Sequence, residues 1–312
     1  MIGLGFDTSN YTTSAAWFDG SQGGSRGRLL EVKEGALGLR QSDSLFQHVK
    51  QLPFVVNELM GNDNLDISAV GASTRPRSVE GSYMPCFLAG ASAGRVLAGV
   101  LQVPFYSFSH QEGHIAAAAW SAGRMDLLDR LHLAWHLSGG TTELLLVEPV
   151  PEGGVNAMRI GGSDDLSAGQ LIDRAGVRLG FSFPAGKTLD VLSQKAEKKA
   201  PFPVKVRNLT FSLSGVENQI NALIESGGSG ETVAYFVLNT IARAVETATK
   251  QAMIAYPGLP LLCSGGVSAN SFIRRVLLPY GAIFAAPDYA RDNAMGVAVL
   301  TCRRWNTEHH VS

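Results

Sequence analysis

The strongest constraint on the fold is a strand pattern that occurs twice along the chain. An apolar segment at 2–7 is followed by a polar turn and a second apolar segment at 14–18. The same order returns at 131–137 and 143–148, separated by a turn of Ser, Gly and Thr at 138–142. Short apolar runs bounded by turn residues are typical of strands. Two such hairpins about 130 residues apart therefore predict an α/β protein with a duplicated domain.

The segments between the hairpins predict further helices and strands. Apolar residues at helical spacing predict helices, at 45–60, 88–101, 239–255 and from about 293 to 304. Short apolar runs predict buried strands, at 69–72, 101–106 and 261–263. A length of 312 residues suits two domains. We assign 1–105 to an N-terminal lobe, with the helix at about 293–304 packing back onto it, and 106–292 to a C-terminal lobe.

Composition excludes several classes of protein. With 45% hydrophobic and 17% charged residues and 35 glycines, the chain is globular rather than disordered or fibrous. No apolar run approaches the roughly 20 residues of a membrane span, and the N-terminus lacks the basic region and apolar core of a signal peptide. The three cysteines form no CxxC pair and no disulfide spacing, which indicates a reducing compartment. We expect a cytoplasmic protein with no membrane partner.

The overall charge gives no signal for nucleic acid. The formal net charge is −1, so binding to RNA would depend on local patches, and we expect no DNA partner. Four basic residues are candidates for phosphate contacts, with solvated surface as the alternative for each: Arg75, Arg77, Lys205 and Arg207.

Two histidines, His110 and His114, stand four residues apart at the start of an Ala-rich segment that predicts a helix. Residues i and i+4 share a helix face, about 5–6 Å apart at Cβ, so both rings can reach one metal ion. The alternative is a capping histidine and a packed one. Asp292, just before the last predicted helix, is the natural third ligand, or else the N-cap of that helix. Two histidines and one carboxylate leave open positions for catalysis by Fe, Zn or Mn.

Three small-residue turns each follow a predicted strand, at 7–9, 138–142 and 264–266. Backbone N–H groups in such turns bind phosphate oxygens, so we expect Gly265 and Gly266 to contact a nucleotide. Asp7, at the end of the first strand, is placed to orient a metal-bound water. The three turns together resemble the phosphate-1, phosphate-2 and adenosine pattern of actin-like ATPases and sugar kinases. A P-loop, a GxGxxG loop and an HExxH motif are all absent from the sequence.

Asp173 lies in a segment that predicts a helix, four residues after Gly169. Its carboxylate could accept ribose hydroxyls, or it could pair on the surface with Arg174 or Arg178. On local sequence alone the surface pairing is favoured.

Six motifs occur in a fixed order: HxEGH, SGGxT, AGxxxD with a following PxG, NLTFSLSG, SGGVSAN and DNAM. In this combination, from Ile2 to about Thr301, the chain resembles the TsaD/Gcp-like family of tRNA threonylcarbamoyladenosine synthases. The resemblance implies the two-lobed actin-like ATPase (ASKHA) fold, with duplicated subdomains and a central cleft. It also implies transfer of a threonylcarbamoyl group from its adenylate to the N6 amine of the adenosine 3′ to the anticodon, with release of AMP.

The resemblance assigns roles to residues of this chain. It implies one divalent metal, iron or zinc, on His110, His114 and Asp292. It implies an adenylate or ATP-type ligand on a set of contacts: Leu137, Ser138, Gly139, Gly140, Thr141, Asp173, Gly186 and Asn270. These residues place the metal and nucleotide-type site in the lobe of 106–292. We assign catalytic roles to Asp7 and Glu112. The implied partners are tRNA, a smaller paralogue and a small ATPase, with a homodimer as a further alternative.

The chain also departs from the family pattern. Asn10-Tyr11-Thr12 replaces the usual Cys-Asp-Glu, Arg75-Pro76-Arg77 stands where Gly-Pro-Gly is expected, and Thr141 replaces a histidine. Gln170 replaces a glutamate, and Ala185-Gly186 replaces Gly-Gly. The loss of these acidic and imidazole side chains indicates a divergent paralogue. The alternative function is a non-catalytic or differently specific nucleotide-binding paralogue that partners a true synthase. Another carbamoyl- or phosphoryl-transfer enzyme is the next alternative, and a metalloprotease is disfavoured.

Overall fold

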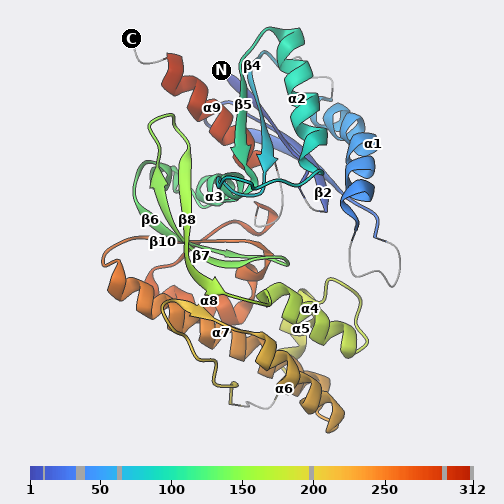
Figure 1. The fold of residues 1–312 in the computed structure, drawn as a ribbon, viewed down its shortest axis with the longest axis vertical. Coiled ribbons are helices and arrows are strands. Elements are labelled where there is room, and N and C mark those ends of the chain that lie inside the picture. Colours follow the sequence, from blue (N-terminus) through green and yellow to red (C-terminus); the bar gives the residue numbers. More distant parts are fainter. Residues whose placement is uncertain (10, 33–38, 62–64, 197–199, 290–293, 310–312) are drawn as a thin grey trace. The chain divides into compact units, whose positions relative to one another are not determined.

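The computed structural model describes residues 1–9, 11–32, 39–61, 65–196, 200–289 and 294–309. Contacts divide the chain into two compact units (Figure 1). Unit 1 comprises Met1–Arg130, Glu148–Ala157 and Arg291–Ser312, and unit 2 comprises Leu131–Val147 and Met158–Ala290. Within the described residues, no helix is long and apolar enough to cross a membrane.

Unit 1 contains a five-stranded sheet in the order β3-β2-β1-β4-β5. The strands are β1 (Ile2–Asp7), β2 (Thr12–Phe18), β3 (Gly23–Leu29), β4 (Ile67–Arg75) and β5 (Phe105–Ser109). β1, β2 and β3 are antiparallel neighbours, whereas β1, β4 and β5 run parallel. The carboxyl ends of β1, β4 and β5 therefore meet at one edge of the sheet.

Helices cover both faces of this sheet. α1 (Gln41–Met60) and α2 (Phe87–Leu101) pack on the face that presents Leu4, Phe6 and Val70. α9 (Met295–His309) lies on the opposite face, where Gly5 leaves no room for a side chain against the α9 backbone. α3 (His110–Ser121) follows β5, and the short helix η1 (Met125–Asp129) follows α3.

α3 belongs to unit 1 because it packs closely on α9. A side chain on Gly296 of α9 would run into the backbone of Gly113 on α3, so glycine at position 296 permits this contact. The units divide after Arg130, whereas our sequence analysis placed the boundary at 105. Gly113 and Gly296 are far apart in the sequence. Their contact therefore produces no periodic pattern in the sequence from which the domain boundary could be predicted.

Unit 2 contains a six-stranded sheet in the order β11-β10-β6-β7-β8-β9. The strands are β6 (His132–Leu137), β7 (Thr142–Pro149), β8 (Val155–Ser163), β9 (Thr210–Phe211), β10 (Leu261–Ser264) and β11 (Ile283–Phe284). Its α-helices are α4 (Ala168–Arg178), α5 (Gly186–Ser193), α6 (Ser214–Glu225), α7 (Gly230–Ala255) and α8 (Ser271–Leu277). Three further 3₁₀ helices are η2 (Gly266–Ala269), η3 (Leu278–Tyr280) and η4 (Pro287–Tyr289).

The core of unit 2 forms on the sheet face that packs against α7. Trp135 on β6 is fully buried there, and its indole N–H donates to Thr249 Oγ1 of α7 at 2.9 Å. α7 is longer than the predicted helix at 239–255 because Ser229 caps its N-terminus by accepting from the Thr232 amide.

The two sheets repeat the same central arrangement. β1 pairs antiparallel with β2 and parallel with β4, and β6 pairs antiparallel with β7 and parallel with β10. Both predicted hairpins are present, each next to a parallel strand.

Candidate metal and nucleotide sites

The start of α3 is fixed by a capping box. Ser109 Oγ accepts from the amide of Glu112 at 3.2 Å, and Glu112 Oε2 accepts from the amide of Ser109 at 2.7 Å. Ser78, in the loop after β4, donates to the same Glu112 oxygen at 2.7 Å. These bonds place His110 in the first turn of the helix and give the Glu112 carboxylate a structural role. Sequence reasoning missed Ser78, whose partner lies 34 residues further along.

The two histidine rings face each other. His110 Nε2 and His114 Nε2 are 2.9 Å apart, and the ring centroids are 4.3 Å apart at an interplanar angle of 70°. On the other side of the first ring, His110 Nδ1 lies 2.9 Å from Asp7 Oδ2. Asp7 Oδ1 accepts from the amide of Ser9 at 2.9 Å. Both Asp7 oxygens are therefore engaged, and the His110 ring is held with Nε2 toward His114.

The two imidazoles are compatible with two of the ligands of one divalent metal. Two imidazole nitrogens on one tetrahedral ion lie about 3.3 Å apart, close to the separation of the two Nε2 atoms. The Asp7 carboxylate behind His110 matches the carboxylate–imidazole arrangement that orients metal-bound histidines. Among the residues that the structure describes, no group of three or more His, Cys, Asp or Glu side chains could hold a metal. Asp292, the predicted third ligand, lies outside the described residues.

In unit 2, hydrogen bonds between its own residues stabilise the turn between β6 and β7. Thr141 N donates to Ser138 Oγ at 3.1 Å, and Ser138 N donates to the carbonyl of Thr141 at 2.8 Å. Gly139 and Gly140 are exposed, and a Cβ on either would meet nothing within 4 Å. Ser167, the N-cap of α4, donates to the carbonyl of Gly139 at 2.7 Å. The glycines therefore present open backbone from a fixed turn, which suits an anionic ligand.

The turn after β10 lies next to this one because β10 pairs with β6. Gly265 has φ of +87°, and a side chain there would collide with the carbonyl of Leu137 at the end of β6. Glycine is thus required both by the backbone conformation and by the close approach. Asn270 caps α8, because its Oδ1 accepts from the amide of Phe272 at 2.9 Å.

The contacts of Asp173 and of the two neighbouring arginines overturn the pairing that local sequence favoured. Arg174 and Arg178 pair with carboxylates on α6, so the favoured surface pairing was wrong. Asp173 Oδ1 instead accepts from the amide of Ala185 at 2.8 Å, directly before Gly186 and α5. Burial raises the pKa of the Asp173 carboxyl, against this hydrogen bond, which lowers it.

A further carboxylate joins the two helices that carry Gly186 and Asn270. Asp190 of α5 accepts from the amide of Ser271 at 2.9 Å and from its hydroxyl at 2.5 Å, at the start of α8. The predicted nucleotide contacts therefore gather at connected turns and helix starts of unit 2. Asp7, Glu112, His110 and His114 belong to unit 1.

Sequence reasoning missed a buried polar group beneath the two glycine turns. His136 of β6 lies opposite Glu143 of β7 and beside Ser264 of β10, and all three are buried. His136 Nδ1 and Ser264 Oγ are 3.1 Å apart. Strand register is the signal that brings these residues together, and it could not be read before the pairing of β6 with β10 was known.

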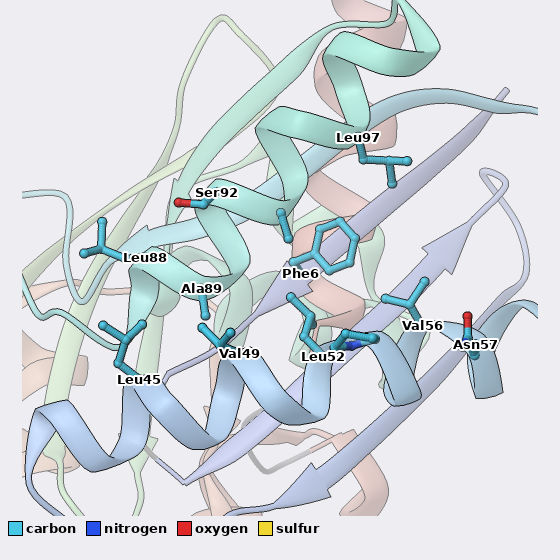
Figure 2. A pocket seen from close by; sticks show the side chains of 12 residues that line it. Phe6, Leu45, Val49, Leu52, Val56, Asn57, Leu88, Ala89, Ser92 and Leu97 are labelled. Atoms are coloured by element: carbon cyan, nitrogen blue, oxygen red, sulfur yellow. The ribbon is translucent and has the colours of Figure 1, made fainter.

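A hollow of about 540 Å³ in unit 1 lies between α1 and α2. Figure 2 shows its apolar lining, which includes Leu45, Val49, Leu88 and Leu97, with Asn57 as one of the few polar groups. The lining contains no titratable side chain among the described residues. The candidate chemistry is therefore sought at the two sites described above.

Comparison with known proteins agrees with this arrangement. Residues 43–299 match the family TsaD, tRNA N6-adenosine threonylcarbamoyltransferase. A protein of that name from Thermus thermophilus is 31% identical, with 83% of this chain and 78% of the relative covered. One from Granulibacter bethesdensis is 30% identical, with 95% and 86% covered. One from Streptococcus pneumoniae is 28% identical, with 84% and 79% covered.

Solved structures share the fold at low identity. Full-length HypF in a phosphate- and nucleotide-bound form gives a TM-score of 0.63 at 13% identity, over 100% of this chain and 47% of that one. A ROK family glucokinase from Streptomyces griseus with glucose and AMPPNP gives 0.52 at 12%, over 96% and 98%. The activator of a 2-hydroxyisocaproyl-CoA dehydratase from Clostridium difficile gives 0.55 at 13%, over 100% and 98%. These likenesses confirm the predicted actin-like ATPase fold.

The relatives are transferases that modify tRNA, and the match runs over most of the chain. The motif order from HxEGH to DNAM and the family match therefore lead to the same result. This chain belongs to the TsaD family, the tRNA N6-adenosine threonylcarbamoyltransferases.

Proposed function

We propose that this protein transfers the threonylcarbamoyl group of threonylcarbamoyl-AMP to the N6 amine of the adenosine 3′ to the anticodon in tRNA, assisted by a metal. The observation that carries the proposal is the pair of facing imidazoles, His110 and His114, with 2.9 Å between their Nε2 atoms and Asp7 behind the first ring. The pair occurs in a chain whose relatives are named as this transferase.

In this proposal His110, His114 and Asp292 hold one divalent ion, iron or zinc. When bound, the ion supplies Lewis-acid polarisation of the carbonyl and phosphate oxygens of the acyl adenylate. Asp7 is a positioning residue that fixes the His110 ring through Nδ1. An adenine amine is a poor nucleophile, so most of the acceleration comes from holding it against the carbonyl.

The glycine turns of unit 2 take the adenylate. The backbone N–H groups near Gly139, Gly140, Gly265 and Gly266 stabilise the charge that develops on the leaving phosphate. Asp173, held by the Ala185 amide, accepts a ribose hydroxyl through its remaining oxygen. The proposed partners are tRNA, a smaller paralogue and a small ATPase, all in the cytoplasm.

The test compares the double variant His110→Ala/His114→Ala with His309→Ala, which removes an exposed histidine near the end of α9. Metal bound per chain and threonylcarbamoyladenosine formed in tRNA are measured in the presence of both partner proteins. We expect the double variant to lose the metal and at least a hundredfold in rate, and His309→Ala to match the wild type. Full turnover by the double variant would contradict the proposal.

A further inference from the structure

Two neighbouring helices of unit 1, α1 and α2, each present a mainly apolar stripe of side chains. Residues at i and i+4 share one face of a helix. On α2 this spacing gives the stripe Leu88, Ser92, Val96 and Val100. On α1 it gives the stripe Leu45, Val49, Pro53 and Asn57. Neither stripe contains a charged residue, and we call the two stripes together the α1/α2 face.

The hollow described above lies between these two stripes (Figure 2). Small side chains form much of its α2 wall, among them Ala89, Ser92 and Ala93, and they leave a groove between the helices. Its volume is about 540 Å³, whereas packed protein interiors contain few voids larger than a water molecule. An apolar hollow of this size therefore suits the side chains of a partner.

The stripe residues beside the hollow are exposed to solvent. Val96 is 69% and Val100 is 76% exposed on α2, and Val49 is 57% exposed on α1. The α1/α2 face exposes on the order of 700 Å² of surface, close to the ~800 Å² that each partner buries in a standard interface. Large contiguous apolar patches on soluble proteins mark interaction sites.

The α1/α2 face contains both halves of a self-complementary contact. Val96 and Val100 are exposed on α2, and the hollow beside them accepts side chains of their size. A two-fold interface requires both features on one patch, because residue i of one copy meets residue j of the other and the reverse. Ridges of residues spaced at i±4 pack into the grooves of another helix, and both stripes have this spacing.

The charges beside the α1/α2 face are compatible with an identical partner. At the sequence positions directly adjacent to the stripe residues, the exposed charged side chains are Lys50 and Glu58 on α1 and Arg95 on α2. Glu58 also pairs with Arg28 of β3. A face surrounded by charges of one sign would repel its own copy, whereas these few charges are of both signs.

We propose that the α1/α2 face binds a second copy of this chain and forms a two-fold dimer. Each copy places Val96 and Val100 against the hollow of the other. The contact buries apolar side chains and leaves charged groups at its rim, which is the usual composition of a stable interface. Dimerisation through unit 1 requires neither the proposed reaction nor its ligands.

The test measures the mass of the protein in solution by sedimentation velocity across the micromolar range of concentration. We expect the wild type to approach twice the 33.1 kDa of one chain, with a dissociation constant in the micromolar range or below. Val96→Glu places a carboxylate in the contact and should weaken the dimer at least about a hundredfold. Because Val96 is exposed in the single chain, the Tm of diluted, monomeric protein should not change.

Val191→Glu is the matched control. Val191 lies on α5 of unit 2 and is 67% exposed, so the same substitution adds the same charge to a helix at nearly the same exposure. We expect this variant to dimerise like the wild type. Val100→Glu repeats the test one helical turn away if Val96→Glu does not fold.

A thiol label locates the interface on the molecule. The three native cysteines are buried. Ser92→Cys places an exposed thiol in the α1/α2 face, and Ser226→Cys places one in unit 2, at the end of α6. We expect Ser92→Cys to lose its reactivity toward a maleimide reagent as the protein dimerises, and Ser226→Cys to react at the same rate in monomer and dimer.

A wild-type chain that remains monomeric at every concentration would overturn the inference, as would a dimer that Val96→Glu leaves intact. Mixing the chain with the smaller paralogue of the proposed function tests the other occupant. If the wild type forms only mixed dimers, and Val96→Glu abolishes them, the α1/α2 face binds a different protein and the second copy is wrong.

Discussion

His136 Nδ1 lies 3.1 Å from Ser264 Oγ, and this contact joins β6 to β10 at the strand ends that lead into two glycine turns. Ser264 Oγ also contacts the carbonyl of Trp135 at 3.3 Å as a donor. The bond ties together the ends of the two strands from which the proposed phosphate contacts extend.

A double-mutant cycle on His136 and Ser264 tests whether their contact contributes to the free energy of unfolding. We expect His136→Leu and Ser264→Ala each to lower the free energy of unfolding by about 1 kcal/mol, with a coupling energy of similar size because the two changes remove one bond. His136→Asn keeps an N–H near the Nδ1 position and is the matched control. Urea unfolding gives the energies, and strictly additive effects would show that the residues act independently.

Two glycines in neighbouring turns predict opposite consequences of the same substitution. Gly140→Ala places a methyl group in open space, so we expect an unchanged Tm but at least tenfold weaker AMP binding, because the methyl group occupies the proposed ligand space. Gly265→Ala forces a methyl group against Leu137 at φ of +87° and should cost at least about 2 kcal/mol of stability. Thermal unfolding and AMP titration check both. An unaltered AMP affinity in folded Gly140→Ala would remove this turn from the site.

The Glu112 carboxylate could act in catalysis or could only cap α3, and substitutions distinguish these two roles. Its carboxylate accepts from Ser109 N and Ser78 Oγ, and glutamine serves equally well in a capping box. We expect Glu112→Gln to keep the stability and most of the transfer rate, and Glu112→Ala to lose about 1 kcal/mol of stability. A hundredfold loss of rate in a well-folded Glu112→Gln would instead assign the carboxylate to acid–base chemistry.

His48 of α1 predicts a pH dependence of stability. Its Nδ1 lies 2.8 Å from Thr13 Oγ1, and its Nε2 is buried with no partner among the described residues. Burial lowers the pKa of His48 from 6.5 to about 4, against the charge of Asp7, which raises it. Between these values the unfolded chain binds the proton and the folded chain does not, so stability falls as the pH falls from 6.5 toward 4.

The full effect is up to about 3 kcal/mol. His48→Asn keeps a donor for Thr13 but does not titrate, so the slope of unfolding free energy against pH should flatten in this window. Chemical unfolding at several pH values measures both slopes. Parallel slopes for the two proteins would mean that His48 does not control the acid sensitivity.

Local sequence pattern predicted the hairpins because apolar runs and turn residues act over a few positions. The β1–β2 and β6–β7 pairs and the i, i+4 histidines on α3 all follow from such short-range rules. The domain boundary did not, because the assignment of α3 depends on its contact with Gly296 of α9. Contacts of that kind arise from tertiary packing and leave no periodic signal.

The sequence indicated which residue types form the sites, but it did not indicate which residues they contact. The sequence indicated that His110 needed further ligands, yet the carboxylate behind its ring, Asp7, lies 103 residues away. Asp173 looked like a surface residue because two arginines follow it in the sequence, but those arginines turn to α6. Only folding shows which of several neighbours a charged side chain meets.

The most direct test of the account is mass spectrometry of tRNA after incubation with this protein, its two partner proteins, threonylcarbamoyl-AMP and a divalent metal. The account predicts N6-threonylcarbamoyladenosine 3′ to the anticodon and one AMP released for each group transferred. Unmodified tRNA, from a protein shown to bind both metal and AMP, would contradict it.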